Sequence, residues 1–365
     1  MIDSRIKKLA HIIVNYSLEV KKGSSVLIDN FDNANQLTKE LINEIFKVGA
    51  NPFVWNNIIN INKEILDNIN EEYINKWIEF DKVQLEKCDY YIAIRNSNNI
   101  NEFSDLKGEK LNLYNKYIDE IHLKLRVRNT KWSVLRYPNE SFAQLAGMNT
   151  EAFEDFYFKV CTLDYSYLSK CMLPLKKLFD DTDKVRIIAK DTDLSFSIKG
   201  HTGGVVDGRA NIPDGEVCTG PIKNSVNGKI KYNVKSTYLG HTFDDIYFEI
   251  KDGKIIKATA NDTKKLNEIL NLDEGCRYFG EFAIGTNPYI DKPINDILFD
   301  EKMTGSIHFT PGNGWGNKSQ IHWDLVQSHL PEYGGGEIWF DDILIRKNGK
   351  FILEQLKSLN AENWE

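Results

Sequence analysis

Long apolar runs are missing from this 365-residue sequence. No stretch approaches the ~20 consecutive apolar residues of a transmembrane helix, and the N-terminal segment has no small-residue cleavage site of a secretory signal. Cysteines are few, odd in number, far apart and without a C-x-x-C pair, namely Cys88, Cys161, Cys171, Cys218 and Cys276. This pattern is typical of thiols in a reducing compartment and argues against zinc fingers. We therefore expect a cytoplasmic protein.

An excess of basic residues is also missing. The net charge of -7 argues against nucleic acid as the main partner, because proteins that bind a phosphate backbone usually carry a basic face. Neither H-E-x-x-H nor G-x-S-x-G occurs, which removes the zincin and serine-hydrolase readings. The GNGWG segment at 312–316 resembles part of a dinucleotide loop, but a strand-like segment follows it, so we expect an active-site turn there.

What the chain does contain is enough apolar sequence for two packed domains. Hydrophobic residues make up 41% of the chain, and its length exceeds that at which a single core normally stops growing. The polar segment DDTDK at 180–184 has no apolar anchor and marks the expected boundary. We predict an N-terminal domain over 1–183 and a C-terminal catalytic domain over 184–365.

The two halves differ in their periodicity. In the first half, helical stripes such as Ile6, Leu9 and Ile13 alternate with short apolar runs at 25–29, 52–55, 90–94 and 132–137, which predicts an α/β domain with a mostly parallel sheet. A helix is expected over 149–157, with Thr150 as its cap. After residue 183, short strands punctuated by glycine predict an α+β domain rich in antiparallel strands.

Candidate functional residues lie where the C-terminal half turns or where polar residues interrupt apolar ones. Glu281 and His308 are flanked by apolar neighbours, and a buried carboxylate there would cost several kcal/mol unless it is paired or binds a metal. In IHWD the two-residue spacing places His322 and Asp324 on one face of a strand. With Glu216 and Glu301, these residues form a mixed oxygen and nitrogen set suited to Zn²⁺, Co²⁺ or Mn²⁺.

The ratio of carboxylates to histidines in this set favours two ions that share bridging carboxylates, as in many aminopeptidases. His201 and His241, in glycine-containing turns, are secondary candidates for lining the site. The remaining histidines, His11, His122 and His329, are expected to be structural or surface residues. Taken singly, each residue has an ordinary structural reading; their joint occurrence within 216–324 carries the argument.

At these residues the sequence resembles the aminopeptidase T and aminopeptidase S family of metalloaminopeptidases, also called the thermophilic metalloprotease family. The similar segments are VNYSLEVKKGSSVLI at 14–28, RYPNESFAQLAGMNTEAFEDFY at 136–157, ANIPDGEV at 210–217, LDEGCRYFGEFAIGTN at 272–287, FDEKMTGSIHF at 299–309 and SQIHWDLV at 319–326. The resemblance implies a homodimeric enzyme that removes N-terminal residues from peptides with a dinuclear metal-activated water.

The resemblance also implies the metal ligands, which are Glu216, Glu281, Glu301, His308, His322 and Asp324. It further implies that shared carboxylates bridge the ions, for which Glu281 and Asp324 are our choice, with Glu216 and His308 on one ion and Glu301 and His322 on the other. A metal-site carboxylate, for which Glu216 is our choice, is expected to assist proton transfer.

One position departs from the family. Trp315 stands where the family usually has an active-site tyrosine, and the loop to His322 is shorter than usual. An indole N–H can still donate to a developing oxyanion, or Tyr333 can supply the hydroxyl. Two alternatives remain open: an inactive homologue that binds peptide or metal, and a dinuclear amidase.

Overall fold

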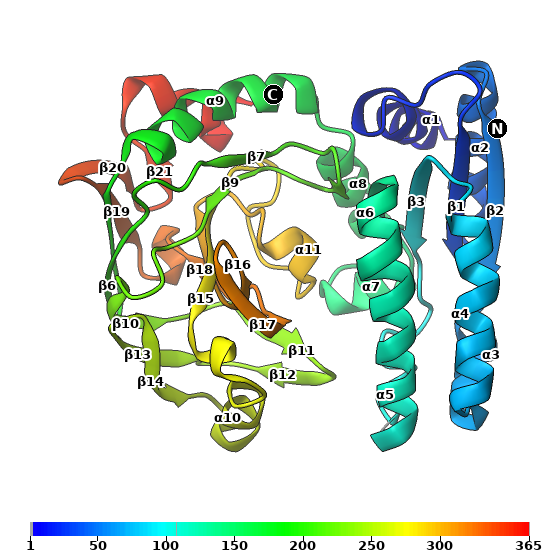
Figure 1. Ribbon diagram of the computed structural model, residues 1–365. Helices are drawn as coiled ribbons and strands as arrows, with labels where there is room; N and C mark the ends of the chain where they lie inside the picture. Colours follow the sequence, from blue (N-terminus) through cyan, green and yellow to red (C-terminus); the bar gives the residue numbers. More distant parts are fainter. Residues whose placement is uncertain (1–2, 107, 365) are drawn as a thin grey trace. The chain divides into compact units, whose positions relative to one another are not determined.

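The structure is a computed structural model that describes residues 3–106 and 108–364. The chain forms two compact units (Figure 1), one made of Met1–Leu163 with Gly208–Ile212 and the other of Asp164–Asp207 with Pro213–Glu365. The predicted domain division at 183 and 184 stays a prediction; the compact units change over at residue 163. No helix among the described residues is long and apolar enough to cross a membrane.

The first unit is built on a parallel sheet with the strand order β2-β1-β3-β4-β8, as predicted for this half. The strands are β1 (Ser25–Phe31), β2 (Asn51–Asn57), β3 (Tyr90–Arg95), β4 (Lys131–Arg136) and β8 (Asn211–Ile212). The helices are α1 (Ser4–His11), η1 (Ile12–Ser17), α2 (Asn35–Lys47), α3 (Ile59–Asn68), α4 (Glu71–Leu85), α5 (Gly108–Tyr117), η2 (Ile118–Arg126), α6 (Val127–Asn129), α7 (Glu140–Leu145) and α8 (Thr150–Cys161).

In this unit, the apolar stripe of the first helix is buried as its periodicity predicts. The stripe of Ile6, Leu9 and Ile13 is buried, and it continues from α1 into the π-helix η1. The cap of α8 is a correction. Asn149, rather than Thr150, is the N-cap, because its side chain accepts a hydrogen bond from the Ala152 N–H.

The second unit contains two larger antiparallel sheets, which agrees with the predicted antiparallel character of this half. One has the order β14-β13-β10-β6-β5-β19-β20-β21, and the other β17-β16-β15-β9-β7 with β18 beside β16. The first is made of β5 (Lys184–Ala189), β6 (Thr192–Ser197), β10 (Asn227–Lys231), β13 (Tyr247–Lys251), β14 (Lys254–Thr259), β19 (Gly336–Phe340), β20 (Ile343–Lys347) and β21 (Lys350–Phe351). The second is made of β7 (Gly204–Val206), β9 (Glu216–Thr219), β15 (Phe279–Gly285), β16 (Ser306–Gly314), β17 (Asn317–His322) and β18 (Val326–Ser328).

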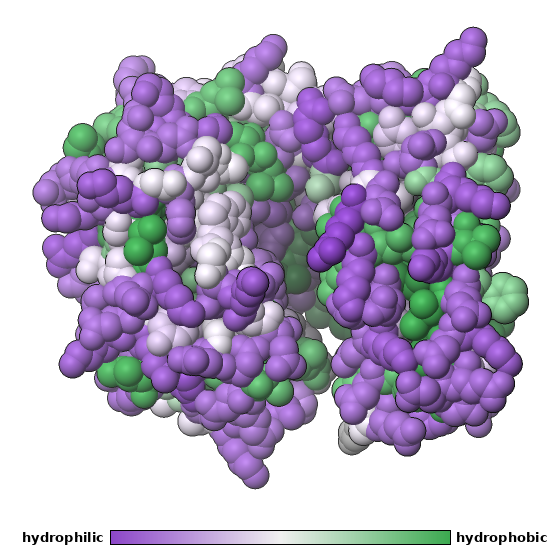
Figure 2. All heavy atoms as spheres, viewed as in Figure 1, coloured by the Kyte–Doolittle hydropathy of each residue, from purple (hydrophilic) through white to green (hydrophobic). Residues whose placement is uncertain are grey.

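Short elements complete this unit. A separate hairpin pairs β11 (Ser236–Tyr238) with β12 (His241–Phe243). The helices are α9 (Tyr165–Asp181), α10 (Thr263–Leu270), α11 (Ile297–Asp300) and the 3₁₀ turns η3 (Glu274–Arg277), η4 (Pro331–Tyr333), η5 (Glu354–Leu359) and η6 (Ala361–Asn363). Hydrophilic residues dominate the faces of both units that Figure 2 shows, with apolar residues in small scattered groups.

An aromatic core joins the two larger sheets of the second unit. Phe196 of β6 lies 5.0 Å from Phe282 of β15 and 4.9 Å from Phe309 of β16, measured between ring centroids. Phe279 lies 4.2 Å from Phe309. Because neighbouring side chains alternate along a strand, Glu281 and His308, which directly precede Phe282 and Phe309, face away from this core.

Candidate metal centre

The second unit brings all six predicted ligands onto one region of the β9-β15-β16 sheet and the segments beside it. Glu216 begins β9, Glu281 lies in β15 and His308 lies in β16. Glu301 follows α11, His322 ends β17, and Asp324 lies two residues further on. Glu281 and His308 precede Phe282 and Phe309, so strand alternation turns them away from the aromatic core.

Four of these residues, Glu281, His308, His322 and Asp324, contact one another directly. The Nε2 atom of His308 lies 3.5 Å from Glu281 Oε1 and 4.0 Å from Asp324 Oδ1. The Nε2 atom of His322 lies 3.1 Å from the same Asp324 oxygen and 3.9 Å from Glu281 Oε2. Each histidine thus faces a different oxygen of Glu281, which is the arrangement expected of a carboxylate between two cations.

Hydrogen bonds to neighbouring residues orient the His322 and Asp324 side chains. His322 Nδ1 lies 2.8 Å from the backbone oxygen of Asn313, to which it can donate while Nε2 faces the site. The Thr310 hydroxyl donates to Asp324 Oδ1 over 2.7 Å. Supporting hydrogen bonds of this type commonly fix the tautomer and direction of metal ligands.

The other two predicted ligands are tied together by a lysine that the sequence analysis did not single out. Lys302 Nζ lies 2.7 Å from Glu216 Oε1, 2.8 Å from Glu301 Oε1 and 3.5 Å from Asp214 Oδ1. All four side chains are buried. In the sequence, Lys302 is notable only because it follows Glu301, and Asp214 only because it lies two residues before Glu216. Neither position indicates that the side chain is buried.

A buried carboxylate oxygen in this region lacks a partner. Glu216 is 4% exposed, and its Oε2 atom accepts no hydrogen bond from any described residue. His308 Nδ1 lies 3.6 Å from this oxygen. A buried anionic oxygen costs free energy unless a proton or cation satisfies it, so the residues present fit a divalent metal site.

The electrostatics are those of a crowded acidic site. Burial raises the pKa values of Glu216 and Glu301 to about 7. Burial acts to lower the pKa values of His308 and His322, but the neighbouring carboxylates outweigh it and raise both to about 10. Burial likewise opposes ionisation of Asp324, yet the His322 hydrogen bond holds its pKa well below the usual range. Without metal, the carboxylates are therefore compensated by the Lys302 ammonium and by the protons of His308 and His322.

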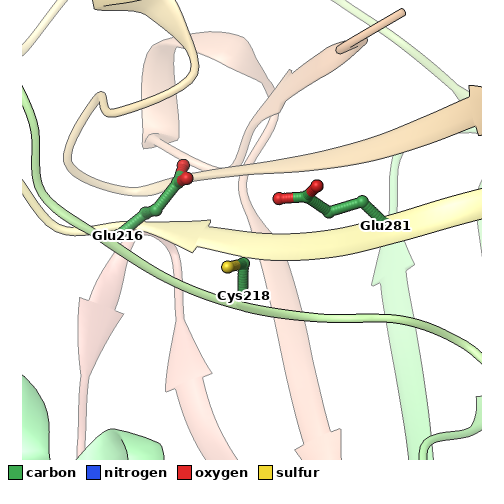
Figure 3. A group of neighbouring side chains, drawn as sticks. All are labelled: Glu216, Cys218 and Glu281. Atoms are coloured by element: carbon green, nitrogen blue, oxygen red, sulfur yellow. The ribbon is translucent and has the colours of Figure 1, made fainter. Parts of the chain in front are cut away.

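Cys218 is a further neighbour that the sequence analysis did not predict. It lies two residues after Glu216 on β9, and one ligand atom each of Glu216, Cys218 and Glu281 lie within 4.8 Å of one another. Figure 3 shows the Glu281 carboxylate directed from β15 toward Glu216, with the sulfur beside them. Burial, then Glu216 and Glu281, raise the pKa of the Cys218 thiol well above its usual range, which disfavours the thiolate.

The two aromatic candidates lie in different places. Trp315 occupies the tight turn between β16 and β17, and it packs so closely on Gly220 that a Cβ atom there would lie 1.9 Å from the tryptophan Cβ. Tyr333 ends η4, and burial, followed by the charges of Glu332 and Asp300, raises its pKa. Both stay predictions as catalytic residues.

The remaining histidines are placed as follows. His201 Nδ1 lies 2.6 Å from the Gly220 backbone oxygen, and His241 is exposed on β12. His11 is exposed, whereas His122 and His329 are buried in their respective units.

Sequence comparisons identify relatives over most of the chain. Residues 2–351 match the family described as thermophilic metalloprotease (M29). Aminopeptidase PepS of Streptococcus thermophilus is 23% identical over 373 residues, which covers 90% of this chain and 88% of that protein. Aminopeptidase 2 of Geobacillus stearothermophilus is 35% identical over 132 residues, covering 34% of this chain and 31% of that protein.

Two solved structures share the fold. AmpT from Thermus thermophilus superposes with a TM-score of 0.83 at 19% identity, covering 96% of this chain and 99% of that one. A 2,5-dihydroxypyridine dioxygenase from Pseudomonas putida gives a TM-score of 0.60 at 12% identity, covering 97% of this chain and 99% of that one. The fold therefore occurs with more than one chemistry, and function has to be argued from the site.

Proposed function

The chain belongs to the thermophilic metalloprotease family, and from this membership we propose that it is an aminopeptidase that uses two divalent metal ions. The observation that supports the metal part most directly is the convergence of His308, His322, Glu281 and Asp324 within 4.0 Å, beside the unpartnered oxygen of Glu216. The relatives named as aminopeptidases support peptides with a free N-terminus as the substrate class.

Bound divalent ions of this type lower the pKa of a water molecule and polarise the scissile carbonyl. The role of the protein is to hold the donors in place. Asn313 and Thr310 orient His322 and Asp324, and the strand pair β15-β16 fixes the spacing of Glu281 and His308. The proposed ligand set is Glu216, Glu281, Glu301, His308, His322 and Asp324, with Glu281 and Asp324 as the bridging pair.

A proton must pass from the attacking water to the leaving amine. Glu216 is the proposed carrier, since it is buried beside Glu281 and one of its oxygens has no hydrogen-bond partner among the described residues. Trp315 or Tyr333 is the proposed donor to the developing oxyanion, in place of the tyrosine that the family usually has.

Three finer parts of the proposal rest on the sequence alone. The metals are Zn²⁺, Co²⁺ or Mn²⁺, as the mixed oxygen and nitrogen donors suggest. The cysteine pattern supports a cytoplasmic location. The resemblance to the family supports a homodimer.

The decisive experiment measures hydrolysis of a panel of aminoacyl-chromogenic amides by chelator-stripped protein, with and without added Co²⁺, Zn²⁺ or Mn²⁺. We expect cleavage only with metal and only of substrates that have a free α-amine. Cleavage of amides whose amine is blocked would instead establish the amidase alternative. Metal binding without any cleavage would establish the binding protein.

A further inference from the structure

Lys302 places a permanent positive charge inside the candidate metal centre. Its ammonium group contacts Glu216 and Glu301, which are two of the six proposed ligands. The other four, Glu281, His308, His322 and Asp324, have no contact with it within 4.0 Å. The ligand set is thus divided into four residues that converge on one another and two that converge on a lysine.

The position of Lys302 is fixed at its backbone. Its N–H donates to the Phe299 carbonyl over 2.9 Å, and its own carbonyl accepts from the Asn287 N–H over 2.9 Å. The residue is 1% exposed, so its ammonium group is shielded from bulk solvent. The lysine therefore stays among the carboxylates for as long as this segment is folded.

The charges show what the lysine can do. Five carboxylates meet here: Asp214, Glu216, Glu281 and Glu301 are buried, and Asp324 is partly buried. Two divalent ions would neutralise the four that belong to the ligand set, and Lys302 would neutralise Asp214. Without the ions, the same ammonium is the nearest cation for Glu216 and Glu301, so it stabilises the empty centre.

We propose that Lys302 competes with a metal ion for Glu216 and Glu301, so that the two ion positions differ in affinity. The ion held by Glu281, His308, His322 and Asp324 would bind first; this division follows the contacts of Lys302 with Glu216 and Glu301, and it replaces the pairing of Glu216 with His308 and of Glu301 with His322 that the sequence suggested. The second ion needs Glu216 and Glu301, whose oxygens it must share with the ammonium group at a distance where two cations repel each other. This inference rests on the proposed use of two metal ions, and it adds the order in which the two ions bind.

The test removes the charge and keeps the length of the side chain. Lys302→Met, Lys302→Arg and the exposed control Lys347→Met are stripped with a chelator and titrated with Zn²⁺ against a metallochromic indicator. The wild type, Lys302→Arg and the control should bind the second ion at least about 10-fold more weakly than the first. In Lys302→Met the second ion should bind at least about 10-fold more tightly than in the wild type.

Thermal unfolding supplies a second readout. Lys302→Met should lower the melting temperature of the metal-free protein more than that of the metal-loaded protein, because in the loaded centre the lysine is needed only for Asp214, whereas in the empty centre it also compensates Glu216 and Glu301. If the metal-free variant does not fold, the loss of Zn²⁺ to excess chelator is followed instead, and it should be slower than in the wild type.

The outcomes separate this inference from the proposed function. If the wild type binds one Zn²⁺ ion and Lys302→Met binds two, Lys302 excludes the second ion completely, and this result also supports the proposal. An unchanged or weaker second ion in Lys302→Met overturns it, while metal-dependent peptidase activity would still stand. If none of the proteins binds Zn²⁺, the proposed function fails together with the inference.

Discussion

Residues that are adjacent in sequence on β15 and β16 face opposite sides of the sheet. Glu281 and His308 face the candidate centre, whereas Phe282 and Phe309, next to them in sequence, pack in the aromatic core. A change at one of the two polar positions should therefore affect metal binding more than stability. This separation makes the site testable by single substitutions that keep side-chain volume.

Glu281→Gln is the sharpest of these. The amide keeps the shape of the side chain but cannot serve as an anionic bridge between cations, so we expect kcat to fall by at least about 100-fold and metal affinity to fall with it. Activity on an aminoacyl amide and Zn²⁺ titration measure the two effects. Glu268→Gln, on the exposed face of α10, is the matched control and should change neither. Full metal-dependent turnover in Glu281→Gln would contradict the ligand assignment.

The proposed role of Trp315 as an oxyanion donor leads to a second prediction. Trp315→Phe removes the indole N–H, and we expect kcat to fall by about 10- to 100-fold if this group donates to the oxyanion. Trp315→Tyr restores a donor and should retain activity. Tyr333→Phe is tested alongside, because the phenol of Tyr333 is the competing candidate. Normal kcat in both phenylalanine variants would exclude both residues from this role.

His122 makes the first unit sensitive to acid. Burial, then the charges of Arg95 and Arg126, lower its pKa to about 3, from a usual value of 6.5. Between these values the unfolded chain takes up a proton that the folded chain does not, so stability should fall as pH decreases from 6.5 toward 3. Hydrogen exchange of β1 and β3 at several pH values measures this loss. It should be smaller in His122→Gln, and it should be unchanged in His241→Gln, which alters an exposed histidine.

Individual residues also mark the limit of sequence analysis. Apolar flanks at Glu281 and the two-residue spacing of His322 and Asp324 are visible in the sequence, and these residues do lie together. Lys302, Asp214 and Cys218 carried no such signal, because their burial depends on segments that are distant in sequence. A lysine beside a glutamate ordinarily indicates a solvated face.

At the scale of elements, a β-bulge in β15 explains how one strand serves both the core and the site. Phe279 pairs with Pro311 and Glu281 with Thr310, so Gly280 is an extra residue in this strand. Phe279 and Phe282 can therefore both face the core while Glu281 faces the centre. The sequence predicts the antiparallel strands, but the period of two alone would place Phe279 and Glu281 on the same face.

Gly280 leaves no room for a side chain. A Cβ atom there would lie 2.5 Å from the Asn313 carbonyl carbon and 2.6 Å from the Gly312 oxygen, both backbone atoms of the β16-β17 hairpin. Gly280→Ala should therefore displace the hairpin that carries His322. We expect a loss of about 1–3 kcal/mol of stability together with weaker metal binding.

The matched control for Gly280→Ala lies in the same hairpin. Gly316 has a positive φ of 84°, but a Cβ atom there would meet nothing within 4 Å. Gly316→Ala should therefore cost about 1 kcal/mol through backbone strain alone and leave metal affinity intact. Urea unfolding and Zn²⁺ titration of both variants compare the effects, and equal metal affinity in the two would show that the bulge does not position the centre.

At the scale of the whole molecule, the chain passes between its two units more than once. Residues 208–212 leave the second unit to add β8 beside β4, and the chain then returns at Pro213, three residues before Glu216. Composition and length predicted two domains, but this short excursion could not be predicted, since two residues of strand have too little periodicity to be recognised.

All six proposed ligands belong to the second unit, which predicts where metal binding adds stability. A ligand that binds only the folded state stabilises the unit that holds it, so Zn²⁺ should slow hydrogen exchange in β9, β15, β16 and β17 by an amount that rises with Zn²⁺ concentration. The strands β1, β2 and β3 should change little. Exchange measured on chelator-stripped and Zn²⁺-loaded protein, with Glu281→Gln as the control that should lose the effect, tests this. Equal protection of both units would mean that they unfold as one, and protection confined to the first unit would place the metal elsewhere.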